Sequence, residues 1–259
     1  MNGRPTVRLL LDTGASGISI APKAAAKAGL EVLSSETAET RGIGDNKPLE
    51  ASSFLASSIE IGGLTFGNYV VSAFRSAQDS DIDGLIGADV FRRFLVTVDF
   101  PHLELLLEPF SNGPSAIEGL EDAPPLPASF SRVLRFGSHL MLLTTVNDSP
   151  RHLFLIDSGA TTNLIDAELA SDVTKIHGDN YTNLHGIQGR VREVSRADRI
   201  TLTFAGFRQV NPSLLAIGME KQGDSFGAAI EGIIGMPVLW NLKVTIDYRA
   251  GAVRMVRGL

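Results

Sequence analysis

Residues 7–20, VRLLLDTGASGISI, decide the fold of this chain, because the same pattern returns at residues 152–165 as HLFLIDSGATTNLI. Each copy is a short apolar run followed by Asp, a hydroxyl residue, Gly, a small residue and a second apolar run. A short apolar run that ends in a turn-forming trio is typical of a buried β-strand. The repeated pattern therefore places two aspartates, Asp12 and Asp157, at equivalent strand ends.

Three further landmarks follow each copy in the same order. Gly42-Ile43-Gly44 returns as Gly186-Ile187-Gln188-Gly189, residues 84–87 (GLIG) return as 232–235 (GIIG), and residues 95–100 return as 243–248. The separations are 145 (157 − 12), 144 (186 − 42) and 148 (232 − 84, and 243 − 95). A separation that drifts by so little indicates an internal duplication with small differences in loop length.

The local patterns of both halves favour strands. We expect strand segments and strand pairs at 7–11, 18–20, 55–61, 96–100/103–107, 153–156, 200–204 and 244–248/253–256, and short helices at 21–28, 89–94, 166–172 and 236–242. Many strands with only short helices predict an all-β chain with a β-barrel or sandwich in each half.

The boundary between the halves is predicted from composition. Residues 111–131 are rich in Pro, Ser and Gly, which resist both helix and sheet and are typical of a semi-stiff linker. We therefore expect an N-terminal lobe at residues 1–110 and a C-terminal lobe at residues 132–259.

Composition excludes several classes of function. The net charge is −6 and no basic stripe is visible, so a nucleic-acid partner has no electrostatic support. The chain has no cysteine, which excludes disulfides, thiolate nucleophiles and cysteine-bound zinc, and its histidines show no HExxH spacing. We expect neither a metal nor a cofactor. No apolar run approaches the roughly 20 residues that span a bilayer.

The N-terminal residues leave the compartment open. Residues 147–150 form an expected turn after the apolar run 140–146, and residues 2–5 occupy the same place in the first half with almost nothing before them. We expect that a leader or a strand has been removed there, so that export, for example to a periplasm, is one possibility and the localisation is otherwise unknown.

The pattern resembles the aspartic proteases, and specifically the retropepsin branch that includes the retroviral proteases. The matching segments are LLLDTGA and FLIDSGA, RGIGD and LHGIQGR, and GLIGADVF and GIIGMPVL. They span nearly the whole chain outside the linker. The resemblance implies two homologous retropepsin- or pepsin-like β-barrel lobes fused in one chain, an active site at their interface, and activity as a monomer on a peptide or protein substrate.

The resemblance also implies roles for individual residues. Asp12 and Asp157 would share one proton, so that the ionised carboxylate activates a water and the protonated one polarises the scissile carbonyl. Thr13 and Ser158 would hydrogen-bond across the interface, while Gly14 and Gly159 would leave space for substrate. The glycine loops would be flap tips that bind the peptide, through Gly42, Ile43, Gly44, Gly186, Ile187 and Gln188.

One departure from the pepsin-like pattern bears on pH. Those enzymes usually carry Ser after the Gly, but Ala15 and Ala160 stand here, as in many retroviral enzymes. Loss of a hydrogen bond to the charged carboxylate raises its pKa. We therefore expect activity at mildly acidic to near-neutral pH.

Plainer interpretations remain open at this point. The two Asp-[Thr/Ser]-Gly trios are also typical of ordinary β-turns, and the glycine loops of ordinary hairpins. The leading interpretation is an aspartic endopeptidase. The alternatives are a catalytically silent peptide-binding module with the same fold, and a protease that processes its own chain or one partner.

Overall fold

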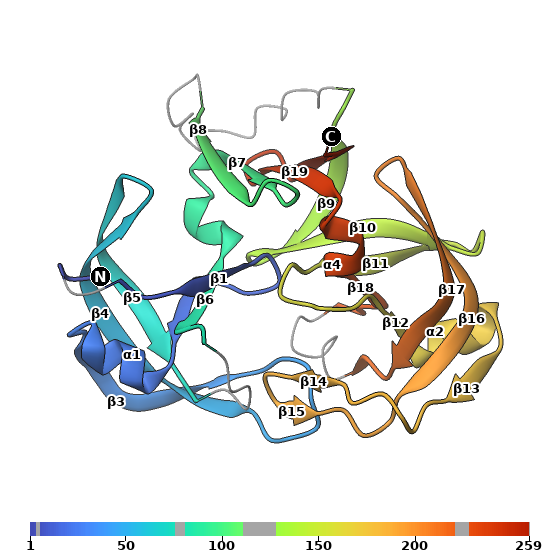
Figure 1. Cartoon of the computed structure of the whole chain (residues 1–259), viewed down its shortest axis with the longest axis horizontal. Coiled ribbons are helices and arrows are strands. Elements are labelled where there is room, and N and C mark those ends of the chain that lie inside the picture. The colour runs from blue at the N-terminus through green and yellow to red at the C-terminus, as the bar shows by residue number, and fades with distance from the viewer. Residues whose placement is uncertain (4–5, 76–80, 111–127, 221–227, 259) are drawn as a thin grey trace.

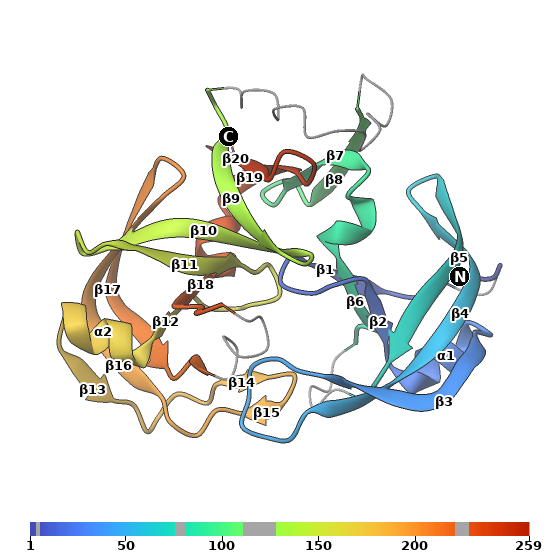
Figure 2. The same cartoon turned by 180° about the vertical axis from the view of Figure 1, so that it is seen from behind.

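The computed structural model describes residues 1–3, 6–75, 81–110, 128–220 and 228–258. Figures 1 and 2 show two β-rich lobes side by side, with strands of both lobes meeting on one side and loops of both lobes meeting on the opposite side. The proposed linker lies mostly outside the described residues, so the division into lobes at 110 and 132 stays a prediction.

The two halves contain corresponding elements in the same order along the chain. The first half contains β1 (Leu9–Asp12), β2 (Ile18–Ile20), α1 (Pro22–Lys27), β3 (Glu31–Thr40), β4 (Leu49–Ile61), β5 (Leu64–Ala73), β6 (Gly84–Gly87), the 3-10 helix η1 (Ala88–Phe91), β7 (Phe94–Asp99) and β8 (Glu104–Pro109). The second contains β9 (Ser131–Phe136), β10 (His139–Val146), β11 (Arg151–Ile156), β12 (Leu164–Asp166), α2 (Ala167–Val173), β13 (Ile176–Gly178), β14 (His185–Gly186), β15 (Gly189–Arg190), β16 (Ser195–Phe204), β17 (Phe207–Ile217), β18 (Gly232–Ile234), α4 (Met236–Leu239), β19 (Leu242–Asp247) and β20 (Ala252–Arg257).

The strand order confirms the duplication. The first lobe has a six-stranded sheet in the order β1-β6-β2-β5-β4-β3, and the second repeats it as β11-β18-β12-β17-β16-β13 within a twelve-stranded sheet. The sense of pairing also repeats: β1–β6 and β11–β18 are parallel, whereas β2–β6 and β12–β18 are antiparallel. The all-β class and the two homologous lobes expected from the sequence are therefore confirmed.

The glycine-bounded segments at 84–87 and 232–235 lie beside the strands that lead into the Asp loops. β6 is sandwiched between β1 and β2, so that the loop between these two strands has to cross over its end. Asp12 pairs directly with Gly87. A Cβ on Gly84 would meet the backbone of Ser19, and one on Gly232 the ring of Phe154. Glycine is required there because the strands pack too closely for any side chain.

The first strand begins later than its apolar pattern predicts, at Leu9 instead of Val7. Its one partner among the described strands is β6, whose pairing starts at Leu9 with Gly84. The equivalent β11 has β10 on its other side and extends over six residues. A strand lasts only as far as its hydrogen-bonding partner, which explains the difference.

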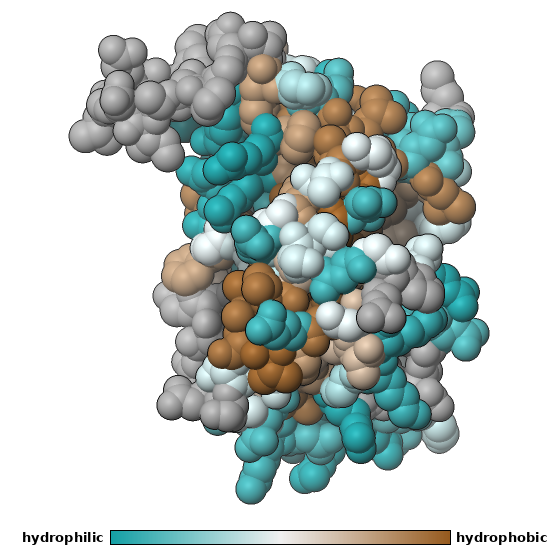
Figure 3. Space-filling view, turned by 90° about the vertical axis from the view of Figure 1, so that its left-hand side faces the viewer, coloured by the Kyte–Doolittle hydropathy of each residue, from teal (hydrophilic) through white to brown (hydrophobic). Residues whose placement is uncertain are grey.

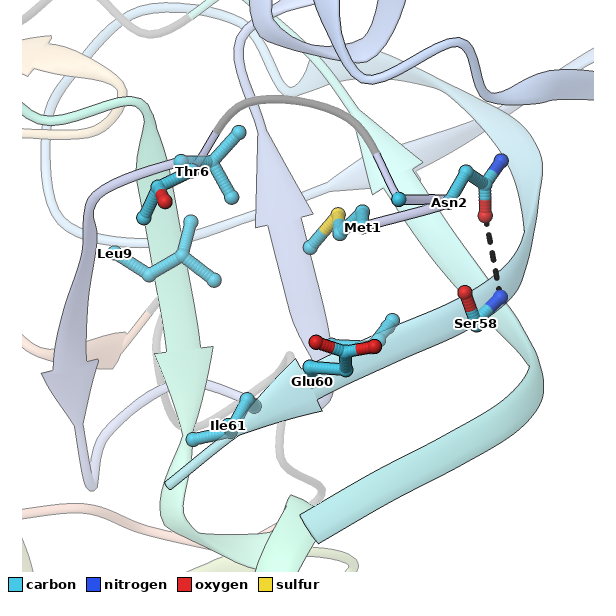
Figure 4. A pocket seen from close by; sticks show the side chains of 10 residues that line it. Met1, Asn2, Thr6, Leu9, Ser58, Glu60 and Ile61 are labelled. Carbon is cyan, nitrogen blue, oxygen red and sulfur yellow. Dashed lines mark hydrogen bonds between the residues drawn. The ribbon is translucent and has the colours of Figure 1, made fainter. Parts of the chain in front are cut away.

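The turns before β1 and β11 have the same geometry. Asn2 and Gly3 have positive φ angles of 50° and 62°, and Asn147 and Asp148 have 45° and 66°. The Oδ1 atom of Asn2 accepts from the Ser58 N–H at 3.1 Å (Figure 4), as that of Asn147 accepts from the Thr201 N–H at 2.7 Å. Each turn is thereby fastened to the long strand of its own lobe, β4 or β16. In the first lobe the turn borders a cavity of about 160 Å³.

The lobes are joined by a sheet that runs β9-β20-β19-β7-β8. β7 and β19 pair antiparallel with Thr97 opposite Thr245, and the two buried hydroxyl groups are 3.0 Å apart. Beside them, Lys243 Nζ lies 3.1 Å from Asp99 Oδ2. Asp99 therefore pairs with a charged side chain. The equivalent Asp247 accepts from the Arg249 and Ala250 N–H groups in a turn and also lies 3.5 Å from the Arg249 guanidinium.

One hydrophobic core runs through both lobes. It contains buried side chains from each half, among them Phe91, Val98, Phe154 and Ile246. A smaller cluster in the second lobe includes Leu155, Leu215 and Ile233. The outer side of the first lobe mixes hydrophilic and hydrophobic areas (Figure 3), and exposed apolar side chains there include Val32 and Val70 of β3 and β5.

We expect Gly84→Ala to lower the free energy of unfolding by about 1–3 kcal/mol, because the added Cβ would lie 2.7 Å from the Ile20 Cα and backbone atoms cannot move aside cheaply. Gly67→Ala in β5 is the matched control, since the atom nearest its added Cβ is 3.9 Å away. Urea titration measures both. Equal stability of the two variants would contradict the packing argument.

Candidate active site

Asp12 and Asp157 occupy equivalent places at the ends of two central strands. Asp12 ends β1, and Asp157 follows β11, where its N–H donates to the Ile234 carbonyl at 3.0 Å. Asp12 Oδ1 accepts from the Gly14 N–H, and Asp157 Oδ1 from the Gly159 N–H, each at 2.8 Å. The short Asp-x-Gly turn thus fixes the orientation of each carboxyl group with its own backbone.

The two carboxyl groups face each other across the lobe interface. A Cβ built on Gly14 would lie 2.5 Å from the Asp157 Cγ, and one on Gly159 would lie 2.5 Å from the Asp12 Oδ2. Each carboxyl group therefore packs on the glycine of the opposite loop. Any side chain at either glycine would displace the facing carboxyl group, so glycine is required sterically at both positions.

Thr13 and Ser158 tie the two loops together by reciprocal hydrogen bonds. The Thr13 N–H donates to Ser158 Oγ, and the Ser158 N–H donates to Thr13 Oγ1, both at 3.0 Å. Each hydroxyl group then donates across the interface at 2.8 Å, Thr13 to the Ile156 carbonyl and Ser158 to the Leu11 carbonyl. These side chains are buried, so the four bonds hold the loops without competition from water.

The electrostatics of the pair favour sharing of a proton. Burial of its carboxyl group between the loops raises the pKa of Asp157 above its ordinary 3.8, and the neighbouring charge and hydrogen bond of Asp12 raise it further. The N–H donors of Gly159 and Ala160 act in the opposite direction. Two carboxyl groups this close cannot both ionise cheaply, and they titrate as one unit.

The sequence alone did not identify two residues that support the Asp loops. Asp89 Oδ1 accepts from the Gly17 N–H at 3.0 Å and holds the first loop, and the buried Asn163 Oδ1 accepts from the Gly235 N–H at 2.8 Å and holds the second. The position equivalent to Asp89 is Pro237, so the repeat carries no signal for this role. Each loop is supported by a different polar side chain.

His139 was also missed. It begins β10 and lies beside the first Asp loop, near the Gly14 backbone and the Asp12 charge. Burial lowers the pKa of this imidazole, which the nearby carbonyl groups and carboxylates only partly oppose. A side chain from the second lobe thereby contacts the Asp loop of the first. The two segments are far apart in the chain, so no local sequence pattern predicts this contact.

The glycine loops expected to be flap tips meet each other. Residues 41–48 form a loop between β3 and β4, and β14 and β15 form a small hairpin; both lie where the lobes approach on the side opposite the joining sheet (Figures 1 and 2). The Gln188 N–H donates to the Ile43 carbonyl, and the Asn46 N–H to the Gln188 carbonyl, both at 3.0 Å. Ile43 also packs on the apolar cluster of the second lobe that includes Leu155 and Ile233, as Ala160 does.

The described part of the chain contains no group of three or more His, Asp or Glu side chains placed to hold a metal ion. Within the same residues, no helix is long and apolar enough to cross a membrane. The arrangement that the structure does present is a pair of facing carboxyl groups in a rigid hydrogen-bonded frame.

Removal of the Thr13 hydroxyl should loosen this frame. Thr13→Val leaves the Ser158 N–H and the Ile156 carbonyl unpaired, and each buried group left unpaired costs roughly 1–3 kcal/mol. Thr13→Ser keeps the hydroxyl and is the control. Urea unfolding should show a large loss of stability for Thr13→Val and a small loss for Thr13→Ser. Similar losses of stability in both variants would mean that the hydrogen bonds of the hydroxyl group contribute little.

The raised pKa of Asp157 has a consequence for stability. Above pH 3.8 the folded state keeps a proton that the unfolded state releases, so the contribution of Asp157 to stability is full at low pH and is lost progressively between pH 3.8 and the raised pKa. We expect the free energy of unfolding to fall between about pH 4 and neutrality, and Asp157→Asn to remove that part of the slope. Asp148→Asn, at an exposed turn, should keep the slope. If the free energy of unfolding changed with pH in the same way in the wild type and both variants, the raised pKa of Asp157 would be contradicted.

A model of the aspartyl protease family matches residues 1–90 and 143–238. Among solved structures, the aspartic proteinase from Irpex lacteus is similar with a TM-score of 0.55, covering 96% of this chain and 89% of its own, at 12% sequence identity. An identity this low shows a shared fold. No curated protein sequence matches the chain.

The family match and the duplicated architecture agree. Each matched segment contains one copy of the Asp-[Thr/Ser]-Gly repeat, at Asp12 in the first and Asp157 in the second. Together the segments cover well over half of the chain. The chain therefore belongs to the aspartyl protease family, as a tandem retropepsin-like member with both lobes in one polypeptide.

Proposed function

We propose that the protein is an aspartic endopeptidase in which Asp12 and Asp157 activate a water molecule for attack on a peptide bond. The observation that carries the proposal is the reciprocal packing of each carboxyl group on the glycine of the opposite loop. The two aspartates are 145 positions apart in the chain (157 − 12), and this contact brings their carboxyl groups together. Each carboxyl group occupies the space that a Cβ on the opposite glycine would need.

The proposed reaction uses the single shared proton of the pair. The ionised carboxylate takes a proton from the water as the water oxygen attacks the carbonyl carbon, and the protonated carboxyl group transfers its proton to the carbonyl oxygen, which gives a neutral diol. The nitrogen then receives the proton that was taken from the water, the C–N bond breaks, and one hydroxyl group of the diol returns its proton to the other carboxylate. The side chains form no covalent bond to the substrate, so the Asp pair returns to its starting state.

The substrate proposed is an extended peptide or a peptide segment of a protein. An extended chain presents backbone N–H and C=O groups along both edges, which suits recognition by backbone pairing with side-chain pockets for specificity. The flap-type residues Gly42, Ile43, Gly44, Gly186, Ile187 and Gln188 lie together on one side of the lobe interface and are the proposed boundary of the binding region. Both lobes are present in one chain, so we propose that a monomer is active.

The proposed pH range follows from the groups around the pair. Ala15 and Ala160 supply no hydroxyl to the carboxylates, and burial together with the Asp12 charge raises the pKa of Asp157. We expect the rate of peptide cleavage to be greatest at mildly acidic to near-neutral pH. A profile measured with one peptide from pH 2 to 8 tests this, and a maximum near pH 2 would contradict it.

The reaction itself is tested with matched amide substitutions. Asp12→Asn and Asp157→Asn should each lower cleavage of a mixed peptide library by at least about 100-fold, because general acid–base catalysis contributes on that scale. Asp148→Asn makes the same chemical change at an exposed turn and should leave cleavage intact. Cleavage that persists in both site variants would refute the pair. Absence of cleavage by every form, with peptide binding retained, would favour the silent binding module.

A further inference from the structure

His139 is a titratable side chain that the proposed reaction does not use, although it lies next to the carboxyl pair. It begins β10 directly after the two-residue turn of the β9–β10 hairpin, where it pairs with Phe136. A two-residue turn fixes the register of a hairpin, and Gly137 in this turn has a φ of 59°, which glycine adopts without strain. The backbone therefore sets the position from which the imidazole extends.

The strand register brings the end of this hairpin to the second Asp loop. β10 pairs antiparallel with β11, with Met141 opposite Leu155. The same register, continued by two residues, places His139 opposite Asp157. Figures 1 and 2 both show the end of the β9–β10 hairpin next to the loop that follows β1. The hairpin thus ends where the Asp loops of the two lobes meet.

The imidazole contacts two backbone carbonyl groups, one from each lobe. Its Nδ1 atom lies 3.3 Å from the Phe136 carbonyl oxygen, and the ring also hydrogen-bonds to the backbone of Gly14 in the first Asp loop. A carbonyl oxygen only accepts hydrogen bonds, so each contact needs an N–H group on the ring. Neutral imidazole carries one N–H group and imidazolium carries two. The protonated ring is therefore the form that matches two acceptors.

The charges around the ring act in the same direction as the carbonyl groups. Burial is the largest influence and lowers the pKa of His139 below its ordinary 6.5, whereas the carboxylates Asp89 of η1 and Asp12 raise it. The cation therefore forms in the acidic part of the pH range. The other four histidines of the chain lie elsewhere, against Asp99, Glu231, Asp198 and Asn183.

This positive charge distinguishes the two members of the carboxyl pair. Of the pair, Asp12 is the carboxyl group that acts on the ring of His139. The influences on Asp157 are burial, the Asp12 carboxyl group and the N–H donors of its own loop. A positive charge beside one carboxyl group stabilises the ionised form of that group. The duplicated loops therefore place their aspartates in different electrostatic surroundings.

We propose that His139 is a positioning residue whose protonated ring bridges the Phe136 and Gly14 carbonyl groups, holds the first Asp loop from the second lobe, and keeps the negative charge of the pair on Asp12. Asp157 then keeps the shared proton, which agrees with its burial. The location of the charge is a property of these groups alone. Its effect on the rate rests on the proposed function, in which Asp12 takes the proton from the water and Asp157 is the acid.

NMR titration of the His139 ring tests the location of the charge without reference to activity. The Hε1 signal is followed from pH 3 to 8 in the wild type, Asp12→Asn and Asp157→Asn. Loss of the Asp12 charge should lower the pKa of His139 by about one unit. Asp157→Asn makes the same change at the protonated member and should leave the pKa of His139 nearly unchanged. Equal shifts in both variants, or no shift in Asp12→Asn, would overturn the proposal.

The pH dependence of peptide cleavage tests the effect on the rate. His139→Gln keeps an N–H donor but cannot carry the charge, so we expect the acid limb of the kcat/KM profile to move up by about one unit. At the acid side of the optimum kcat should fall roughly ten-fold, with KM changed by less than about two-fold. His177→Gln is the matched control, because that imidazole is exposed and lies 3.0 Å from Asp198; it should leave the profile unchanged.

The outcomes separate the role of His139 from the proposed function. If the pKa of His139 falls in Asp12→Asn alone and no form of the protein cleaves peptides, the location of the charge is upheld and the proposed peptidase activity fails. If the wild type cleaves peptides and His139→Gln keeps the same acid limb and kcat, the activity is upheld and the role of His139 fails. A lower kcat with an unmoved acid limb would mean that His139 only supports the loop, which also overturns the proposal.

Discussion

The reciprocal hydrogen bonding of Thr13 and Ser158 is the constraint on which the rest of the site depends. Two carboxyl groups repel each other once both are charged, so they stay side by side only if the loops that carry them are held from behind. Four bonds of 2.8–3.0 Å do this with buried hydroxyl and backbone groups of both lobes. Their geometry leaves glycine as the residue against each facing carboxyl group. Burial between the loops, and after it the close Asp12 carboxyl group, raises the pKa of Asp157.

Besides the shared hydrophobic core, polar contacts between the described residues connect the two lobes at three levels, and each uses a different kind of interaction. The joining sheet provides a backbone ladder with Thr97 opposite Thr245 in its buried middle. The Asp loops provide the hydroxyl bonds next to the carboxyl pair. The Gly-rich loops provide the contact centred on Gln188. The first two are buried and symmetric, whereas the third is one-sided, because only the second lobe contributes a glutamine.

Duplication explains the symmetric parts of the molecule, and the departures from symmetry lie in individual side chains that hold the loops. Strand order, pairing sense and the turns at Asn2 and Asn147 repeat between the lobes. Asp89 and Asn163 support equivalent loops with different side chains, and Gln188 has no counterpart. A backbone arrangement survives divergence because it depends on strand pairing, but side-chain contacts between loops can be replaced one at a time.

The sequence by itself determined the duplication, the all-β class and the equivalence of Asp12 and Asp157, because apolar runs, turn residues and glycines that separate close strands are local requirements that leave a repeated pattern. The apolar pattern placed the start of the first strand too early, since strand length depends on a partner strand. Only the tertiary structure decided which groups meet across the lobes: the facing carboxyl groups, His139 beside Gly14, Asp89 under its loop, and the Gln188 amide on the opposite backbone. Such contacts join residues far apart in the chain, and their geometry is set by how the lobes pack, which no local pattern encodes.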